Sequence, residues 1–210
     1  MDYFYCSPEN IRSSSLDIQD DELAHLVHVM RKKVGDEVRV VDGRGNAFDV
    51  RLEEITKKIA RATILSSYHH HHEPSIDITL AVGILKNPSK FDFLVEKVSE
   101  LGVKEIIPLQ TERTIPPHAK VDRWQKLALA AMKQSGRSYL PTVRELMSFD
   151  TLLAEGQRFD RKYIAHEIPM EKKLGASSEA HQTVLALIGP EGGFSGEEIG
   201  RATAAGCIPL

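Results

Sequence analysis

The chain has 210 residues, a formal net charge of −3 at pH 7, and 41% hydrophobic residues. This length suits one large domain or two small ones, and the hydrophobic fraction is enough for a buried core. Its two cysteines provide neither a disulfide framework nor a cysteine-based zinc motif, so no metal site is predicted.

The sequence carries no recognisable targeting signal. Its first residues, Met1-Asp-Tyr-Phe-Tyr-Cys6, lack the charged and apolar regions of a signal peptide. No apolar run approaches the length of a transmembrane helix. The sequence therefore predicts a soluble protein of a reducing compartment, the cytoplasm.

Residues 1–70 indicate a small β-rich domain with one helix. Strands are expected at residues 3–6, 37–41, 47–55 and 59–65. Asp42-Gly-Arg-Gly45 is a strong hairpin signal between two of these strands. Four or five short strands that close on themselves are typical of a small barrel. The histidine run His69–His72 leads into a predicted polar linker at residues 71–75.

The one helix of this domain is predicted to run to Lys33, with Asp20 or Asp21 as its cap. Its apolar face is made of Leu23, Val27 and Met30. Histidines and basic residues gather on the exposed side: His25, His28, Arg31, Lys32 and Lys33. Contact with an RNA backbone is one interpretation of this pattern, and a solvated helix face is the other.

From Ile76 onward, strands and helices alternate. A strand is predicted at residues 76–85, a helix that begins at Asn87-Pro88 and ends at Gly102, and a strand at 103–109. The expected buried face of this helix consists of Phe91, Leu94, Val95, Val98 and Leu101. A strand–helix–strand unit of this kind implies a parallel sheet.

A second helix is predicted at residues 122–135, with an apolar stripe of Trp124, Leu127, Ala128, Ala131 and Met132 for ordinary core packing. Its polar side carries Arg123, Lys126 and Lys133. The stretch from Arg113 to Arg144 holds seven basic residues and one acid, a net charge of +6. This stretch is the candidate electrostatic footprint for RNA. A short helix at 149–153 and a strand at 162–166 follow.

A glycine-rich turn organises the C-terminal part of the chain. A buried strand is predicted at residues 183–189, then the turn Gly189-Pro-Glu-Gly-Gly193, then a helix from Ser195. Ser195 and Glu198 form a capping box, with Phe194 as a hydrophobic staple. In open α/β sheets, ligands bind at the carboxyl ends of strands.

The spacing of the glycines matches neither the dinucleotide fingerprint nor the P-loop. Glu191 would repel a pyrophosphate, and it suits a cationic ligand such as a sulfonium. The alternative is a helix-entry turn that binds no ligand. After the helix, Cys207–Leu210 begins a strand that stops at once, so the chain is expected to be incomplete at this end.

The sequence resembles the ribosomal small-subunit methyltransferase E family, which belongs to the SPOUT methyltransferases. The motifs that carry the resemblance are 31–35, Glu100-Leu-Gly-Val103, Pro108 with Thr111-Glu-Arg113, Arg123-Trp124, Gln134-Ser-Gly-Arg137 and Gly189-Pro-Glu-Gly-Gly193. The resemblance implies an α/β protein with a PUA-like RNA-binding barrel at 1–70. A SPOUT methyltransferase domain with a trefoil knot follows at 76–210, incomplete at its C-terminus.

The resemblance also implies S-adenosylmethionine as methyl donor, a homodimer, and methylation of uridine N3 in the decoding region of 16S rRNA. A related SPOUT enzyme that acts on another base or a ribose 2′-hydroxyl remains open, as does a non-catalytic RNA-binding assembly factor. The residues expected to contact RNA are His25, His28, Arg31, Lys32, Arg123 and Lys133.

Methyl transfer to an imide nitrogen needs charge stabilisation on the base and a group that takes the proton. Arg113 and Arg137 are expected to stabilise the charge that spreads onto the uracil oxygens. Glu100 and Glu191 are the candidate bases or orienting groups. The expected lining of the adenosyl pocket is Ile188, Gly189, Pro190, Gly192 and Gly193.

Overall fold

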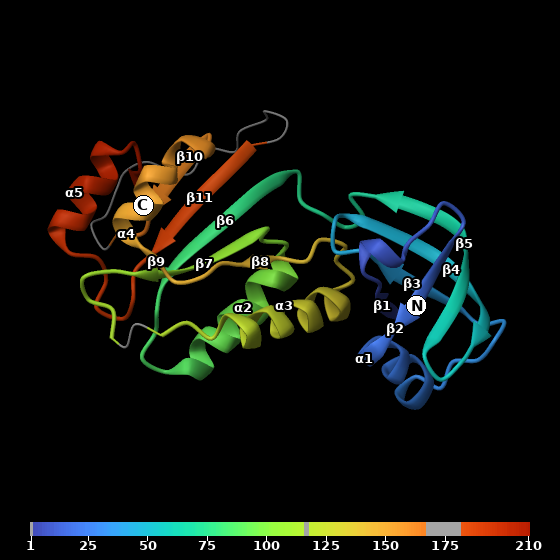
Figure 1. Ribbon diagram of the computed structural model, residues 1–210. Coiled ribbons are helices and arrows are strands. Elements are labelled where there is room, and N and C mark those ends of the chain that lie inside the picture. The colour runs from blue at the N-terminus through green and yellow to red at the C-terminus, as the bar shows by residue number, and fades with distance from the viewer. Residues whose placement is uncertain (1, 116–117, 167–181) are drawn as a thin grey trace. The chain divides into compact units, whose positions relative to one another are not determined.

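The chain forms two compact units, one of residues 1–73 with 129–140 and the other of residues 74–128 with 141–210. The computed structural model describes residues 2–115, 118–166 and 182–210 (Figure 1). Helix α3 (Val121–Ser135) is divided between the two units. The functional boundary that the sequence places at residues 71–75 stays a prediction.

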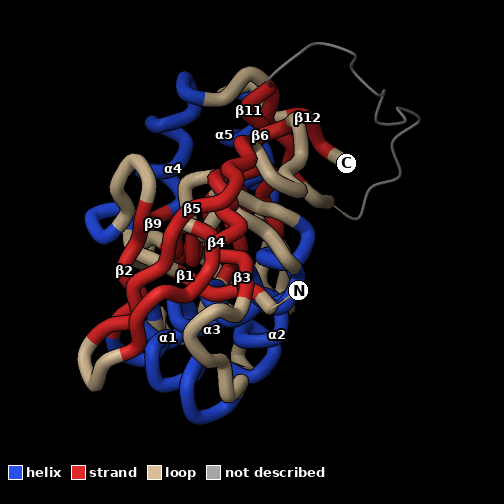
Figure 2. The backbone as a smooth tube through the Cα atoms, turned by 90° about the vertical axis from the view of Figure 1, so that its right-hand side faces the viewer, coloured by secondary structure: helices blue, strands red, loops and turns tan. Residues whose placement is uncertain are grey.

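A curled five-stranded sheet forms the first unit, in the order β1-β3-β4-β5-β2 (Figures 1 and 2). Its strands are β1 (Tyr3–Tyr5), β2 (Ser15–Gln19), β3 (Glu37–Val41), β4 (Asn46–Ile55) and β5 (Ile59–His69). β1 pairs with β3 in parallel, and the other pairs are antiparallel. The strands predicted from the sequence are confirmed, although β5 continues to His69.

β2 is absent from the sequence-based expectation. Its central residues are buried, and one of them is Asp17, whose carboxylate accepts from Arg12 at 2.9 Å and from Arg61 at 3.0 Å. A buried acid interrupts the apolar pattern by which a strand is identified. Only the fold, which brings Arg61 of β5 beside β2, explains why the acid is tolerated.

The β3–β4 hairpin is confirmed, and Asp42 holds it closed. One carboxylate oxygen of Asp42 accepts from the backbone N–H of Arg44 at 2.7 Å and of Asn46 at 3.0 Å. Gly43 and Gly45 take positive φ angles of 72° and 96°, which glycine adopts without steric cost. The signal is local, so the sequence alone was sufficient to predict it.

The predicted helix of the first unit is shorter than expected. α1 (Asp20–Ala24) continues into a single π-helical turn (His25–Val29), and the chain leaves the helix at Arg31, where φ is +54°. Its N-cap is Gln19, which makes no side-chain capping bond, so the prediction of an aspartate cap is wrong. The apolar face is confirmed, with Leu26 fully buried at its centre.

The second unit contains a seven-stranded parallel sheet in the order β12-β10-β11-β6-β7-β8, with β9 also paired to β7. Its strands are β6 (Ile76–Gly83), β7 (Glu105–Gln110), β8 (Thr142–Val143), β9 (Met147–Ser148), β10 (Arg161–Ile164), β11 (Gln182–Ile188) and β12 (Ile208–Pro209). The predicted parallel sheet is therefore confirmed. β6 and β11 are neighbours in the sheet. The chain continues from β6 to β7 on one side of this pair, and from β11 to β12, beyond β10, on the other side.

Helices cover the faces of this sheet (Figure 1). The helices wholly within the second unit are α2 (Pro88–Leu101), α4 (Phe149–Ala154) and α5 (Gly196–Ala204). Short 3-10 turns stand at Pro8–Asn10 in the first unit and at Glu155–Arg158 in the second. α4 and α5 pack on one face, where Phe149, Leu152 and Ala202 join the buried cluster of Ile107 and Leu187. Among the described residues, no helix has the length and apolar character that a membrane span requires.

α2 begins and ends where the sequence predicts. The side chain of Asn87 accepts from the N–H of Ser89 at 3.0 Å, and Gly102 closes the helix with φ +88°. Its buried face is centred on Phe91, Val95 and Ser99. Leu101 is 70% exposed, because at 100° per residue it lies about 120° from the centre of that face. The prediction that Leu101 is buried is wrong.

The capping box of α5 is present. Ser195 Oγ accepts from the N–H of Glu198 at 3.2 Å, and Glu198 Oε2 accepts from the N–H of Ser195 at 2.9 Å. Phe194 lies in the same cluster as Ile199, as a hydrophobic staple requires. The helix that follows the glycine turn therefore has a fixed starting point.

Replacing Ser195 with Ala removes the oxygen that accepts the buried Glu198 N–H. We expect unfolding free energy to fall by about 1 kcal/mol, and Tm to fall by about 2–4 °C. Differential scanning calorimetry measures the change. Ser67→Ala, at an exposed residue of β5, is the control. Equal Tm values for wild type and Ser195→Ala would contradict the role of the cap.

Candidate functional site

Three neighbouring strands of the second unit end at the same edge of the sheet. β6 lies between β11 and β7, with Ile188 level with Val82, and Gly83 level with Leu109. The loops that follow these strands therefore emerge side by side. This edge, at the carboxyl ends of parallel strands where the connections diverge, is where α/β sheets bind ligands.

The glycine turn, residues 189–193, follows β11 at this edge. Ile188 before it is 41% exposed, and Glu191 and Gly192 are exposed as well. The N–H of Gly193 donates to Pro190 O at 2.8 Å, and Gly193 has a φ of +66°. The turn is thus a tight backbone loop that is exposed at Glu191 and Gly192, with the Arg113 stem against Gly192.

Close backbone contacts fix the position of the glycine turn. A Cβ on Gly83 would lie 2.5 Å from Pro190 N and Cδ, and a Cβ on Gly189 would lie 2.9 Å from Gly193 C. Neither distance is possible for a real side chain. The end of β6 therefore presses directly on the turn, and the turn folds closely on itself.

Polar contacts join the three loops. Both carboxylate oxygens of Glu191 accept from the N–H of Lys86, in the loop after β6, at 3.1 and 3.3 Å. Arg113, in the loop after β7, donates from Nη1 to Gly192 O at 2.7 Å. The N–H of its neighbour Glu112 donates to Glu198 Oε1 at 2.9 Å. Each of the other two loops is thus held by the segment that runs from the turn into α5.

The chemical character of the site follows from these residues. It offers an exposed peptide group at Gly192, a half-buried one at Gly193, an apolar side chain at Ile188, and exposed charges of both signs at Glu191 and Arg113. Such a surface can accept hydrogen bonds, contact a flat apolar group and complement a positive charge. Within the described parts of the chain, no group of three or more His, Cys, Asp or Glu residues could hold a metal ion.

The predicted cofactor-binding residues lie together at this site, but not all in the same way. Ile188, Gly192 and Gly193 reach its surface, whereas Pro190 is buried against Gly83. Pro190 therefore supports the turn from beneath and does not line its surface. Gly189 is half-buried, and its missing side chain is what permits the close approach of Gly193. Their binding of a cofactor stays a prediction.

The four candidate catalytic residues occupy different places. Arg113 and Glu191 are at the glycine turn. Glu100 accepts from Lys97 at 2.6 Å in the last turn of α2, which ends beside the start of β7, at the opposite edge of the sheet. Glu100 is therefore not part of the site in this unit. Arg137 belongs to the first unit, where its guanidinium donates to His72 O.

The predicted RNA-contacting residues that follow α1 are only partly exposed. His28 and Arg31 are exposed, but His25 is half-buried against the Phe4 ring, at a centroid distance of 5.7 Å. Lys32 is also half-buried, and it pairs with Asp2 at 2.8 Å. His25 and Lys32 are therefore only partly exposed, and contact of either with RNA stays a prediction. Lys32 is half-buried because the helix has already ended at Arg31 and the lysine pairs with Asp2. His25 is half-buried because its ring packs against Phe4.

The two predicted RNA contacts on α3 are engaged in ion pairs. Arg123 donates to Asp92 of α2 at 2.7 and 3.1 Å, beside the indole N–H of Trp124, which donates to the same carboxylate at 3.0 Å. The hydrogen bond from Arg123 lowers the pKa of Asp92 below its usual range. Lys133 pairs with Glu22 of α1. Both residues stabilise their units, and an RNA role for either stays a prediction.

Sequence reasoning missed the residues that connect the loops, which are Gly83, Lys86 and Glu112. It identified Glu198 as a capping residue but missed that its carboxylate also accepts from Glu112. Gly83 gave the best available signal, since a glycine at the end of a strand often marks a close backbone approach. Lys86 and Glu112 make these contacts through their backbone N–H groups, so the pattern of side chains in the sequence does not predict them. The partner loops are also far apart in the chain.

Two family models match the chain: an RNA methyltransferase domain over residues 72–210, and an RNA methyltransferase PUA domain over residues 18–65. A Bacillus subtilis protein named ribosomal RNA small subunit methyltransferase E is 29% identical over 199 residues, which cover 89% of this chain and 77% of the relative. A protein of the same name from Synechocystis is 30% identical over 211 residues, which cover 97% of this chain and 68% of the relative.

Solved structures show the same fold. The ribosomal RNA small subunit methyltransferase E of Neisseria gonorrhoeae, bound to S-adenosyl methionine, has a TM-score of 0.84 and 31% identity, covering all of this chain and 88% of that one. A methyltransferase of Legionella pneumophila in complex with the same cofactor has a TM-score of 0.81 and 28% identity, covering 99% and 87%. The PUA-like unit followed by a methyltransferase α/β unit is therefore the fold of this chain.

Gly189→Ala tests whether the turn depends on a bare backbone. The new methyl group would overlap Gly193, so we expect a loss of about 1–3 kcal/mol in unfolding free energy and faster amide exchange at Gly193. Gly200→Ala is the matched control, because nothing lies within 4 Å of its Cβ position and alanine favours a helix by up to about 1 kcal/mol. Urea unfolding that shows equal stability for the two variants would contradict this geometry.

Proposed function

This chain belongs to the ribosomal RNA small subunit methyltransferase E family, and on that premise we propose that it methylates N3 of a uridine in 16S rRNA, with S-adenosylmethionine as donor. The observation that carries the proposal is the open glycine turn, held by the loops of two neighbouring strands at the carboxyl edge of the sheet. An rRNA substrate implies a cytoplasmic location.

The residues of the turn fit the donor. Gly193 has nothing within 4 Å of its Cβ position, and only the Arg113 stem lies that near Gly192, so a ligand can approach their peptide groups closely. The exposed part of Ile188 suits one face of an adenine. The carboxylate of Glu191 carries the charge that a sulfonium requires, and its bonds to the Lys86 N–H fix its direction. Ile188, Gly189, Gly192 and Gly193 are thus proposed to hold the cofactor.

S-adenosylmethionine supplies an activated methyl group on a sulfonium, so this chain has to supply position and electrostatics. Arg113 is proposed to stabilise the negative charge that develops on a uracil oxygen as N3 loses its proton. One of its five N–H donors is used to bond Gly192 O, which fixes the guanidinium at the turn. Glu191 is proposed as the partner of the cationic donor. Arg137 is a second candidate for charge stabilisation, because it falls in the family motif at 134–137.

Nucleoside mass spectrometry of 16S rRNA tests the function. Cells that lack the gene are expected to lose one 3-methyluridine, and the wild-type gene is expected to restore it. Arg113→Gln should lower the methylation rate of purified small subunits by about a hundredfold. Arg201→Gln removes an exposed arginine of the same unit, paired with Asp150, and should leave the rate unchanged.

Two results would contradict this function. Unchanged 3-methyluridine in the deletion strain, with loss of a 2′-O-methyl nucleoside, would favour the related SPOUT reaction. Calorimetric titration that detects no binding of S-adenosylmethionine would favour a non-catalytic RNA-binding assembly factor.

A homodimer is proposed as the working form, and α2 offers a surface for it. A shallow, mostly apolar groove on this helix is lined by Ser89, Lys90, Phe93, Leu94, Lys97 and Val98. Phe93 is 62% exposed, and Lys97 Nζ lies 5.8 Å from the centre of its ring. A large exposed aromatic beside partly buried aliphatic residues is typical of an interface.

Phe93→Lys should therefore shift the dimer toward monomer by at least about tenfold in dissociation constant, because it places a charge in the apolar groove. Sedimentation equilibrium measures the shift. Leu101→Lys, at a 70% exposed position of the same helix outside the groove, is the control and should leave association unchanged. Equal association of the two variants would move the interface elsewhere.

A further inference from the structure

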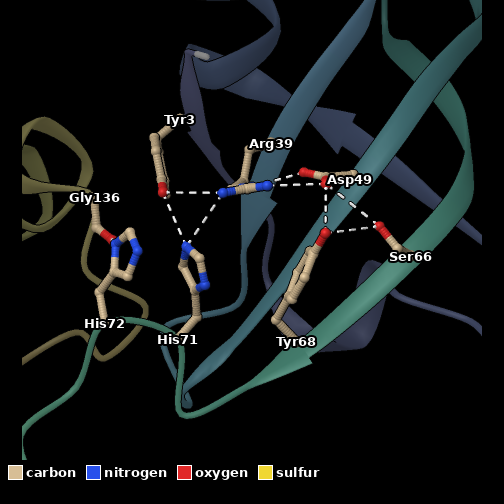
Figure 3. Close-up of polar contacts among 8 residues, drawn as sticks. All are labelled: Tyr3, Arg39, Asp49, Ser66, Tyr68, His71, His72 and Gly136. Carbon is tan, nitrogen blue, oxygen red and sulfur yellow. Dashed lines mark hydrogen bonds and ion pairs between the residues drawn. The ribbon is translucent and has the colours of Figure 1, made fainter.

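The histidine run His69–His72 belongs to the first unit and overlaps the predicted linker at residues 71–75. Figure 3 shows a chain of polar contacts that ends on His71. Arg39 donates to both oxygens of Asp49, at 2.7 and 2.9 Å, and Tyr68 OH donates to the same carboxylate at 3.0 Å. The guanidinium of Arg39 lies 5.1 Å from the centre of the Tyr68 ring. This arrangement fixes both Arg39 and Tyr68.

His71 is held by the same group. Its Nε2 lies 3.0 Å from Tyr3 OH and 3.4 Å from Arg39 Nη1. An arginine can only donate, so Nε2 of His71 must accept and the ring is neutral. Burial, followed by the charges of His72 and Arg39, lowers the pKa of His71 below its ordinary value. His71 is therefore a fixed, uncharged ring at neutral pH.

His72 stacks on this fixed ring. The two imidazole centroids are 3.8 Å apart, with an angle of 25° between the planes. His72 Nδ1 lies 3.2 Å from Gly136 O, and since a carbonyl only accepts, this nitrogen carries the hydrogen. His72 is nevertheless exposed, and Tyr68 is 38% exposed. His71 covers one face of His72, so a stacking ligand would have to approach the other face.

A positive charge accompanies the stack. The guanidinium of Arg137 donates to the backbone oxygen of His72, which places a positive charge at this residue. Flat rings packed on one another next to a cation are the elements with which proteins hold unpaired nucleobases and their phosphates. No group of metal-ligating side chains exists here among the residues that the structure describes, although four histidines follow one another.

We propose that the ring cluster of Tyr68, His71 and His72 is a stacking site for one unpaired base of the RNA substrate. The base lies on the outer face of His72, and Arg137 contacts a neighbouring phosphate. This inference rests on the proposed function for its RNA, but it concerns the first unit and needs no methyl donor. It adds residues that the predicted RNA-contacting set, at residues 25–32 and on α3, does not include.

Measuring RNA binding at lower pH distinguishes a stacking contact at His72 from electrostatic attraction alone. The groups that face His71 are Tyr3 of β1, Arg39 of β3, Asp49 of β4, Tyr68 of β5, and its chain neighbours His72 and Glu73. Of the two acids, Asp49 already binds Arg39 through both oxygens. A proton on His71 would face the Arg39 guanidinium, so the stack should loosen as the pH falls through the lowered pKa of His71. Electrostatic binding of RNA strengthens as a protein gains positive charge. If His72 acts by stacking, the difference in RNA affinity between wild type and His72→Ala should instead become smaller at low pH.

The test uses the full chain and fluorescence anisotropy with a labelled single-stranded RNA of twelve uridines, at fixed salt. His72→Ala should weaken binding by about tenfold at pH 7.5, and His72→Phe, which keeps a flat ring, should restore it. His69→Ala is the matched control, because that exposed histidine bonds Asn46 and does not join the stack; its affinity should stay within about twofold of wild type. As the pH is lowered from 7.5 to 5.5, the difference in affinity between wild type and His72→Ala should shrink.

Equal binding by wild type and His72→Ala would overturn the stacking site and leave the proposed function intact. Binding by His72→Phe as weak as that of His72→Ala would also overturn it, because the Nδ1 bond to Gly136 would then be what matters. If the wild-type chain bound neither this RNA nor 16S rRNA, the proposed function would fail together with the inference. Circular dichroism of each variant confirms that it is folded.

Discussion

The contact between the end of β6 and the glycine turn is the constraint on which the candidate site depends. Gly83 and Pro190 approach so closely that no side chain at residue 83 could be accommodated. Because of this approach, the loop after β6 comes within hydrogen-bonding distance of Glu191, and the turn is held from one side. Arg113 and Glu112 hold the turn and the start of α5 from the other side. The hydrogen bonds to Glu191, Gly192 and Glu198 therefore depend on the contact between Gly83 and Pro190, which sets the position of the turn.

This arrangement places an open backbone surface on a rigid support. The turn is fixed by the close approach of its own glycines, by a buried proline beneath it, and by a capped helix after it. Rigid support matters because methyl transfer depends on the alignment of donor and acceptor more than on any reactive side chain. The exposed charges of Glu191 and Arg113 then have defined positions, one suited to a cationic donor and the other to an anionic base.

Local signals in the sequence predicted much of the fold, and long-range contacts account for what was missed. Asn87-Pro88, Gly102 and the Ser195–Glu198 box each act within a few residues, so the helix boundaries they mark are confirmed. The pairs Lys133–Glu22, Arg123–Asp92 and Lys86–Glu191 join residues far apart in the chain, and no spacing rule reveals them. Basic residues that suggested RNA contact are thus partly engaged in the fold. The location of the site could be predicted from its glycines, but the loops that hold it could not.

The most direct test of the account is an NMR titration of the ¹⁵N-labelled chain with S-adenosylmethionine, which reports on each backbone amide separately. The account predicts saturable shifts at the amides of Gly189, Gly192 and Gly193, together with the Lys86 amide that Glu191 holds. Saturable binding that moved amides elsewhere in the chain, and left these four unchanged, would contradict it.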